Sequence, residues 1–191
     1  MVTGDTITFT FLKLGIPGLL LLKTDIFTDE RGLFSERYVS SIFKENGISD
    51  KFGQDSCSLS RKNVIRGMHY QLEPNAQGKL VCVLSGSIFD AAVDIRKGSA
   101  TFGRWVGEEL SAQNGKMLWI PRGFAHGFAV LEDNTIVLYK TTKEYSKIHE
   151  RGIKWDDPSI GIDWPVKNPI VSAKDSLLPR LKDAEINFVF N

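Results

Sequence analysis

Turn-forming residues recur at short intervals along most of the chain, and this spacing limits what the chain can fold into. They fall at residues 15–18, 29–32, 73–78, 85–86, 97–99, 113–115 and 133–134. The segments between them are short and rich in Val, Ile, Leu and aromatic residues, which favours strands over helices. Many short strands with close turns are typical of a β-sandwich or barrel. We therefore expect an all-β fold in which any helices are short and peripheral.

One pair of segments has a clear local pattern. Residues 79–84 and 87–95, separated by Ser85-Gly86, are predicted to form a β-hairpin closed by a tight turn. In the second strand, the period of two separates an apolar face from a face that carries Asp90 and Asp94. We therefore expect one dry face and one carboxylate face on this strand.

Length and charge narrow the class of protein. The 191 residues contain no linker-like stretch and no internal repeat, so residues 1–191 are assigned to one domain. A formal net charge of +1 argues against a nucleic-acid partner. The apolar run at residues 19–22 is too short for a signal core or a membrane span, and the two cysteines, Cys57 and Cys82, fit a reducing compartment. We expect a cytoplasmic protein without a membrane partner.

The three histidines are the first candidates for chemistry, because imidazole changes its charge near neutral pH. They are His69, His126 and His149. In a strand over residues 64–71, His69 shares a face with small or polar residues, so it is either a core histidine or a catalytic one. A metal site built on a His-x-His pair is disfavoured, because Gln71 stands at the second position of the pair.

Other short motifs have structural explanations of their own. Residues 29–32 suit a type I turn. Ser172 followed by Asp175 is typical of a helix N-cap, so a short helix is expected there, and another at residues 39–45. On this pattern alone, Asp175 is either a capping residue or a functional carboxylate. Residues 119–128 are denser in Gly, Pro, His and aromatic residues than an ordinary loop and strand.

A longer series of motifs follows one order along the chain. They are Asp29-Glu30-Arg31-Gly32 with Phe34 and Glu36, Gln54-Asp55, Arg66-Gly67-Met68-His69-Tyr70-Gln71, Gln77-Gly78-Lys79-Leu80, Phe89-Asp90, residues 121–128, Leu138-Tyr139-Lys140, Tyr145, residues 155–157 and 160–165, and Ser172-Ala173-Lys174-Asp175. In these motifs the chain resembles the dTDP-4-dehydrorhamnose 3,5-epimerase family. The resemblance spans roughly residues 16 to 180 and implies a cupin-like jelly-roll barrel with short peripheral helices.

The resemblance implies an isomerase that makes dTDP-4-dehydro-L-rhamnose from dTDP-4-dehydro-6-deoxy-D-glucose by inverting C3 and C5. Hydrogens next to a ketone leave as protons through an enolate, so the reaction needs a base, an acid on the opposite face and a cation at the enolate oxygen. By the resemblance, His69 is the base, Tyr139 the acid and Lys79 the cation. Asp175 orients the His69 imidazole, and Asp90 is a supporting acidic residue. No metal or other cofactor is implied.

The resemblance also implies which residues hold the nucleotide sugar. Arginine forks suit bidentate contact with phosphate, and an aromatic ring suits stacking on a base. The implied contacts are Arg31 and Arg66 at the phosphates, Tyr145 on the thymine, and Glu36, Gln54, Asp55, Lys79, His126, Glu150 and Lys174 elsewhere. Relatives are homodimers, so a second copy of the chain is the expected partner. Ser56 and Cys57 depart from the Asn-His common in relatives, and His149 has no implied role.

Three alternatives stay open at this point. An epimerase that inverts only C3 or only C5 would use the same fold and base, although Tyr139 favours the double reaction. A non-catalytic sugar-nucleotide-binding protein would keep the pocket but has no need of matched proton carriers. A metal-dependent cupin enzyme is opposed by Gln71.

Overall fold

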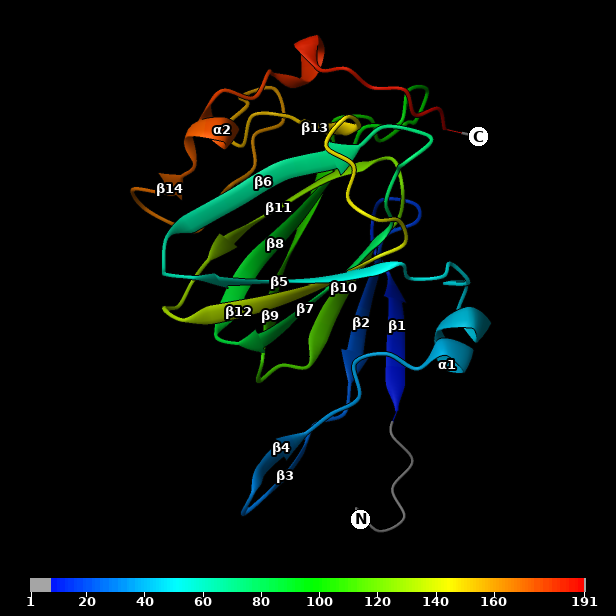
Figure 1. The fold of residues 1–191 in the computed structure, drawn as a ribbon, viewed down its shortest axis with the longest axis vertical. Coiled ribbons are helices and arrows are strands. Elements are labelled where there is room, and N and C mark those ends of the chain that lie inside the picture. The colour runs from blue at the N-terminus through cyan, green and yellow to red at the C-terminus, as the bar shows by residue number, and fades with distance from the viewer. Residues whose placement is uncertain (1–7, 191) are drawn as a thin grey trace.

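The structure, a computed structural model, describes residues 8–190 and consists mainly of β-strands (Figure 1). The strands are β1 (Phe9–Lys13), β2 (Leu20–Thr24), β3 (Phe27–Asp29), β4 (Gly32–Phe34), β5 (Gln54–Ser60), β6 (Val64–Gln71), β7 (Lys79–Ser85), β8 (Ser87–Asp94), β9 (Trp105–Ser111), β10 (Lys116–Ile120), β11 (Phe124–Val130), β12 (Thr135–Thr141), β13 (Glu150–Gly152) and β14 (Ile170–Val171). The helices are α1 (Ser40–Glu45), α2 (Ala173–Ser176) and the 3₁₀ turn η1 (Leu181–Asp183). The all-β prediction with short helices is confirmed.

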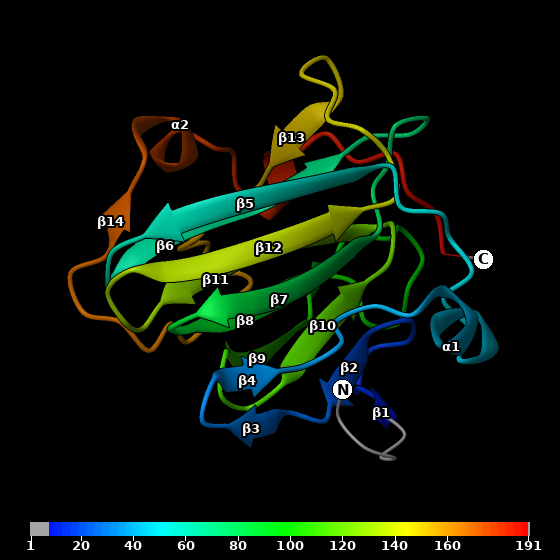
Figure 2. The same ribbon diagram turned by 60° about the horizontal axis from the view of Figure 1, so that its bottom comes forward.

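Two sheets face each other, and the chain crosses between them repeatedly (Figure 2). The first sheet has the order β1-β2-β10-β7-β12-β5, and the second has the order β13-β6-β11-β8-β9 with β14 added in parallel to β6. From β5 to β12 every connection changes sheet except the one between β8 and β9. Of the strands β5 to β12, the first sheet contains β5, β7, β10 and β12, and the second contains β6, β8, β9 and β11. These two sets are the four-stranded halves of a jelly roll, which confirms the predicted architecture.

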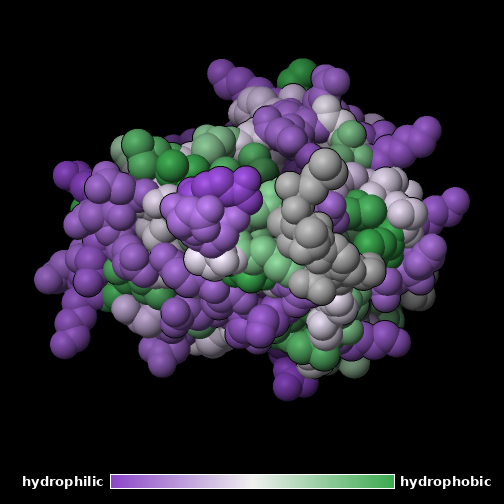
Figure 3. All heavy atoms as spheres, turned by 90° about the horizontal axis from the view of Figure 1, so that it is seen from below, coloured by the Kyte–Doolittle hydropathy of each residue, from purple (hydrophilic) through white to green (hydrophobic). Residues whose placement is uncertain are grey.

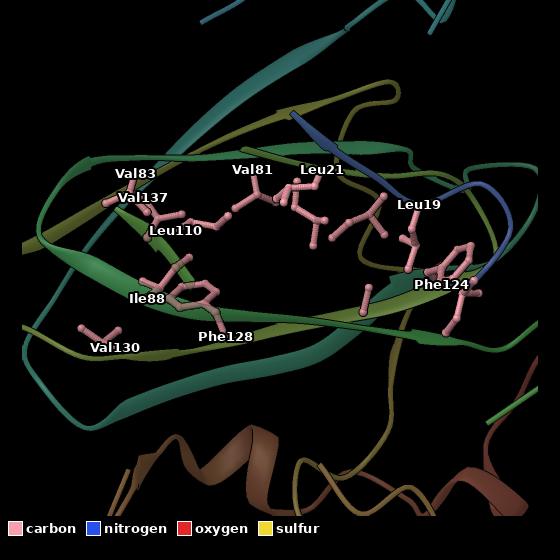
Figure 4. Close-up of a cluster of buried hydrophobic side chains, with 14 residues drawn as sticks. Leu19, Leu21, Val81, Val83, Ile88, Leu110, Phe124, Phe128, Val130 and Val137 are labelled. Carbon is pink, nitrogen blue, oxygen red and sulfur yellow. The ribbon is translucent and has the colours of Figure 1, made fainter. Parts of the chain in front are cut away.

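Apolar side chains from both sheets fill much of the space between them (Figure 4). Val81 and Val83 point inward from β7, and Ile88 and Phe128 meet them from β8 and β11. Burial of each such side chain contributes roughly 1.5–3 kcal/mol. This cluster holds the two sheets together, and Phe128 belongs both to it and to the wall of the pocket described below.

Strands β7 and β8 form at the predicted residues but do not pair as the predicted hairpin. β7 pairs with β10 and β12, whereas β8 pairs with β9 and β11 in the other sheet. Gly86, with φ of 74°, turns the chain across the barrel, and a Cβ there would lie 2.2 Å from Thr135 Oγ1. The predicted division of β8 into two faces holds, because Ala91, Val93 and Ile95 pack in one apolar cluster whereas Ile88 and Ala92 belong to another. Asp90 and Asp94 are fully buried, so both faces are buried against protein.

Strand β6 departs from regular alternation near Gly67. The register against β11 shifts between Arg66 and His69, which is a β-bulge. The two strands approach closely because Gly67 faces Gly127, where a Cβ would lie 3.1 Å from the Gly67 Cα. As a result Arg66 and His69 line the same pocket, whereas regular alternation predicted opposite faces for them.

The peripheral elements agree with the predicted positions. Helix α1 lies within the expected residues 39–45, and α2 follows Ser172 as expected. The turn expected at residues 29–32 joins β3 to β4 in a hairpin that extends away from the two sheets (Figure 1). Among residues 8–190, no helix is long and apolar enough to span a membrane.

Candidate active site

A pocket of about 620 Å³ opens among strands of both sheets. Strands β5, β7 and β12 of the first sheet contribute to its wall, as do β6 and β11 of the second sheet and the segment that leads into α2. The site residues expected from the sequence that line it are Gln54, Arg66, His69, Lys79, His126, Tyr139, Tyr145, Lys174 and Asp175. Residues far apart in the chain thus meet around one cavity.

His69 and Asp175 form a carboxylate–imidazole pair at this pocket. The distance between His69 Nε2 and Asp175 Oδ1 is 2.8 Å, and the other carboxylate oxygen accepts the Gly67 backbone N–H at 3.3 Å. In the neutral ring, an Nε2–H that donates to the carboxylate leaves Nδ1 with a free lone pair. Burial raises the pKa of Asp175, but the hydrogen bonds from His69 and Gly67 outweigh it and hold this pKa below its usual value. Asp175 is therefore an anion at neutral pH.

The helix cap predicted at Ser172 explains how Asp175 reaches His69. Ser172 Oγ accepts the Asp175 backbone N–H at 3.0 Å, which starts the four-residue helix α2. The Asp175 carboxylate is directed at His69 on β6 instead of serving the helix end. The two interpretations of this motif therefore divide between two residues, since Ser172 is the cap and Asp175 is the partner of the imidazole.

Tyr139 enters the pocket from β12, in the sheet opposite His69. Its hydroxyl lies 2.7 Å from Ser58 Oγ on the neighbouring strand β5. Burial raises the pKa of Tyr139 to about 12, with a smaller opposing effect from the Ser58 hydrogen bond. The phenol is therefore protonated at neutral pH and able to donate a proton.

Lys79 places a cation in the pocket beside His69. Its Nζ donates a hydrogen bond to the His69 backbone carbonyl at 3.3 Å. Burial lowers the pKa of Lys79 to about 8, and the negative charges of Asp90 and Glu150 only partly offset this effect. At pH 7 most Lys79 side chains are charged, and the charged fraction falls as the pH rises through about 8.

Asp90 supports a different histidine from the catalytic candidate. Its Oδ1 lies 2.7 Å from His126 Nε2, and both side chains are buried. Burial lowers the pKa of His126, although the contact with Asp90 opposes this effect. His126 lines the pocket, and Asp90 lies behind it. Within the described chain, the other carboxylate oxygen of Asp90 has no hydrogen-bond partner.

A chain of contacts connects the aromatic and cationic residues at another part of the pocket. Tyr145 Oη donates to Glu150 Oε2 at 2.8 Å, and Glu150 Oε1 accepts from Lys174 Nζ at 2.6 Å. The hydrogen bond to Glu150 raises the pKa of Lys174 and also that of Tyr145. For Glu150, burial raises the pKa, but the bonds from Lys174 and Tyr145 outweigh it and lower the pKa overall. Glu150 thus holds both pocket residues without lining the pocket itself.

Three residues expected at the site lie elsewhere in this chain. Arg31 is in the turn between β3 and β4, where it pairs with Asp29, and Glu36 follows β4. Asp55 is on β5, but it pairs with Lys140 at 2.8 Å instead of lining the pocket. None of these three side chains lines the pocket of its own chain.

Three residues have no role implied by the resemblance: Ser56, Cys57 and His149. Ser56 lines the pocket and accepts a hydrogen bond from Gln54 Nε2 at 2.8 Å, whereas Cys57 is exposed. His149 bonds Ser146 Oγ at 2.8 Å.

Ser58, the hydrogen-bond partner of Tyr139, is not among the site residues predicted from the sequence. Its alternation with Gln54 and Ser56 on β5 is the signal that would have placed it on the pocket face. Within residues 8–190, no group of three or more His, Cys, Asp or Glu side chains is arranged to hold a metal ion.

Comparison with known proteins gives consistent matches over most of the chain. The family model described as dTDP-4-dehydrorhamnose 3,5-epimerase matches residues 13–183. A protein of that name from Shigella flexneri is 53% identical over 175 residues, which cover 91% of this chain and 97% of the relative.

Solved structures match as well. The crystal structure of a dTDP-6-deoxy-D-glucose-3,5-epimerase from Legionella pneumophila, in complex with dTDP-4-keto-L-rhamnose, has a TM-score of 0.89 and 44% identity, and the match covers 92% of this chain and 94% of that one. A 3′-monoepimerase from Streptomyces bikiniensis, in complex with dTDP-quinovose, has a TM-score of 0.84 and 28% identity, with coverage of 88% and 86%.

Proposed function

The chain belongs to the dTDP-4-dehydrorhamnose 3,5-epimerase family, and from this premise we propose that it converts dTDP-4-dehydro-6-deoxy-D-glucose into dTDP-4-dehydro-L-rhamnose. The observation that carries the proposal is that two proton carriers face one pocket from opposite sheets, His69 from β6 and Tyr139 from β12. Inversion at carbon requires removal of a proton from one side and its return from the other. A base and an acid on facing walls meet that requirement.

His69 is the proposed base. Its Nδ1 lone pair takes the proton from C3 or C5, and the electron pair of the broken C–H bond forms the C=C bond of an enolate. The C4 oxygen then carries the negative charge. Asp175, 2.8 Å from Nε2, stabilises the imidazolium that results and keeps the ring in the required tautomer.

Lys79 and Tyr139 complete the step. A charged Lys79 beside the C4 oxygen stabilises the enolate more than the neutral ketone, so it lowers the barrier. The protonated Tyr139 phenol delivers its proton to the opposite face of the carbon, and the C=C electrons form the new C–H bond. Solvent then reprotonates the Tyr139 phenolate and removes the proton from His69 before the second centre reacts.

Other pocket residues suit a nucleoside diphosphate. Arg66 is exposed, and its Nε donates a hydrogen bond to Ser60 Oγ at 3.1 Å. Within the described chain its side chain makes no other hydrogen bond, so its terminal nitrogens are available for phosphate oxygens. Lys174 supplies a second positive charge at the pocket. Tyr145 is 53% exposed, so its ring face is accessible for stacking on thymine.

A homodimer is the proposed working form. Arg31 lies in the turn of the projecting β3–β4 hairpin, and Glu36 lies just after it (Figure 1). In a homodimer, these two side chains contribute to the pocket of the second copy. Leu33 and Phe34 of that hairpin are 57% and 53% exposed, and Leu59 on β5 is 64% exposed. The surface viewed from this end is a mosaic of hydrophilic and hydrophobic side chains (Figure 3). Adjacent exposed apolar side chains such as Leu33 and Phe34 favour burial against another molecule.

The dimer is tested by light scattering after size-exclusion chromatography. A mass of two chains is expected for the wild type, and Leu33→Glu is expected to shift it towards one chain. A wild-type mass of one chain at micromolar concentration contradicts the dimer.

The free thiols of Cys57 and Cys82 support the reducing cytoplasm as the proposed compartment.

The epimerase activity is tested by proton NMR of dTDP-4-dehydro-6-deoxy-D-glucose with the purified, chelator-treated protein in deuterated water. Loss of both the C3 and C5 hydrogen signals is expected, with trapping of the L-sugar by its reductase. Loss of one signal assigns single-centre epimerisation, which is disfavoured because the 3′-monoepimerase is much less similar to this chain than the 3,5-epimerases are. Nucleotide binding without exchange assigns a binding protein.

A further inference from the structure

Amide side chains hold the backbone on both sides of Tyr145. Gln71 Oε1 accepts the Ser146 backbone N–H at 2.6 Å, and Gln71 Nε2 donates to the Glu144 carbonyl at 3.2 Å. Gln54 Oε1 accepts the backbone N–H of Tyr145 itself at 2.7 Å. The segment lies beyond the end of β12, so side chains supply the hydrogen bonds that a neighbouring strand supplies elsewhere.

Gln71 is the most buried member of this arrangement. Gln71 is 3% exposed, and its Nε2 also donates to the Asn75 carbonyl at 2.7 Å. Both ends of the carboxamide are therefore used. Gln77, a little further along the same loop, donates to the Lys143 carbonyl at 2.8 Å. Gln71 thus connects the loop after β6 with the segment that carries Tyr145.

The position of Gln71 relates Tyr145 to the catalytic candidate. Gln71 is the last residue of β6, two positions after His69. Its partner in β13 is Glu150, whose carboxylate accepts the Tyr145 hydroxyl at 2.8 Å. The backbone of Tyr145 is therefore tied to β6, and its hydroxyl is tied to the residue paired with β6. Both contacts therefore tie Tyr145 to the strand that carries His69.

We propose that Gln71 is a positioning residue that holds Tyr145 in place for the nucleotide and so controls the affinity for the nucleotide end of the substrate. This inference rests on the proposed function, in which Tyr145 stacks on thymine. Gln71 is not among the residues that line the pocket, so its effect on binding passes through the segment it holds. Proton transfer by His69 stays intact once substrate is bound.

The test is Gln71→Glu, which keeps the shape and the acceptor for Ser146 but loses both donor hydrogens and places a carboxylate against two carbonyl oxygens. Loss of two buried hydrogen bonds is expected to weaken dTDP binding by about tenfold or more in calorimetry. KM is expected to rise in parallel, while kcat stays within about twofold of the wild type. Gln113→Glu, an exposed change of the same chemistry away from the pocket, is the matched control and leaves all three constants unchanged.

A double-mutant cycle separates positioning from a general structural role. In a Tyr145→Ala background, Gln71→Glu is expected to cause little further loss of dTDP affinity. An equal loss in both backgrounds, or a fall in kcat with unchanged dTDP affinity, overturns the proposal. If the glutamate variant does not melt cooperatively, Gln71→Met, of similar length and without charge, is carried through the same cycle and judged by the same outcomes.

The same measurements distinguish failure of the proposed epimerase activity from failure of the proposed role of Gln71. A wild-type chain that binds dTDP without turnover refutes the epimerase, yet the affinity cycle on dTDP still decides the role of Gln71. A wild-type chain that does not bind dTDP overturns both.

Discussion

Asp175→Asn tests the carboxylate–imidazole pair most directly, because it removes a charge with almost no change in shape. The Asp175 side chain is 6% exposed, and Oδ1 lies 2.8 Å from His69 Nε2. An asparagine that turns its NH₂ group towards Nε2 forces the proton of the neutral ring onto Nδ1. The nitrogen proposed as the base then lacks its lone pair, and the imidazolium lacks its counter-ion.

The size of the effect follows from the geometry. Two unit charges about 4 Å apart at an effective dielectric of about 20 interact by about 4 kcal/mol. His69 is 30% exposed at its side chain, so solvent screens part of this interaction. A loss of about 2.7 to 4 kcal/mol in the transition state lowers kcat by roughly 10² to 10³. Affinity for dTDP is expected to stay the same, because Asp175 is not assigned to the nucleotide.

The assay is kcat at pH 7 by coupled reduction of the product, together with dTDP affinity and thermal melting. Asp157→Asn is the matched control: Asp157 is also buried, but its carboxylate accepts the Leu181 and Ser159 backbone N–H groups, away from the pocket. It is expected to lower the melting temperature and leave kcat near that of the wild type. A folded Asp175→Asn variant with kcat within fivefold of the wild type refutes the dyad, as does an equal loss in the Asp157 control.

Three further predictions address other parts of the site. Tyr139→Phe removes the proposed acid and is expected to lower kcat by roughly 10² to 10⁴, while His69 still exchanges the hydrogen it removes; NMR in deuterated water measures both, and unchanged epimerisation contradicts the role of Tyr139. Burial lowers the pKa of Lys79 to about 8, so the cation is present below that pH and is lost above it. The value of kcat/KM is therefore expected to fall as the pH rises through about 8, and Lys79→Arg, always charged, is expected to remove that limb; a pH profile without a limb near this value is inconsistent with the assignment. Gly127→Ala places a Cβ 2.8 Å from the Arg66 carbonyl oxygen and is expected to destabilise the fold by about 1–3 kcal/mol. Thermal melting checks this, and an unchanged melting temperature shows that the bulge relaxes freely.

The sequence predicted much of the local structure, because local patterns report local physics. Alternation of side chains reports burial on two faces, so β6 and β8 were expected within a residue or so of their observed bounds. The sequence predicts Ser172 as a helix cap because its hydroxyl can accept the free backbone N–H of Asp175, three residues later. This contact is local, so it does not depend on where the helix packs. The motifs that resemble one family also indicated most of the residues around the pocket, including His69 and Tyr139.

Only the tertiary structure decided which of these elements and side chains meet. A period of two does not specify a pairing partner, so β7 and β8 were expected as a hairpin although Gly86 carries the chain from one sheet to the other. The resemblance implied only that Asp90 is a supporting acidic residue, and the pairing of β8 with β11 is what brings its carboxylate beside His126.

The site itself depends on long-range contacts. His69 and Asp175 are 106 positions apart in the chain, and Gln71 holds a segment more than seventy positions away at Glu144. Such contacts form because closing both sheets over one apolar core buries more surface than any local arrangement of the same strands. The sequence by itself therefore indicated the candidate residues for the chemistry, and the packing of the two sheets determined which of them face one another.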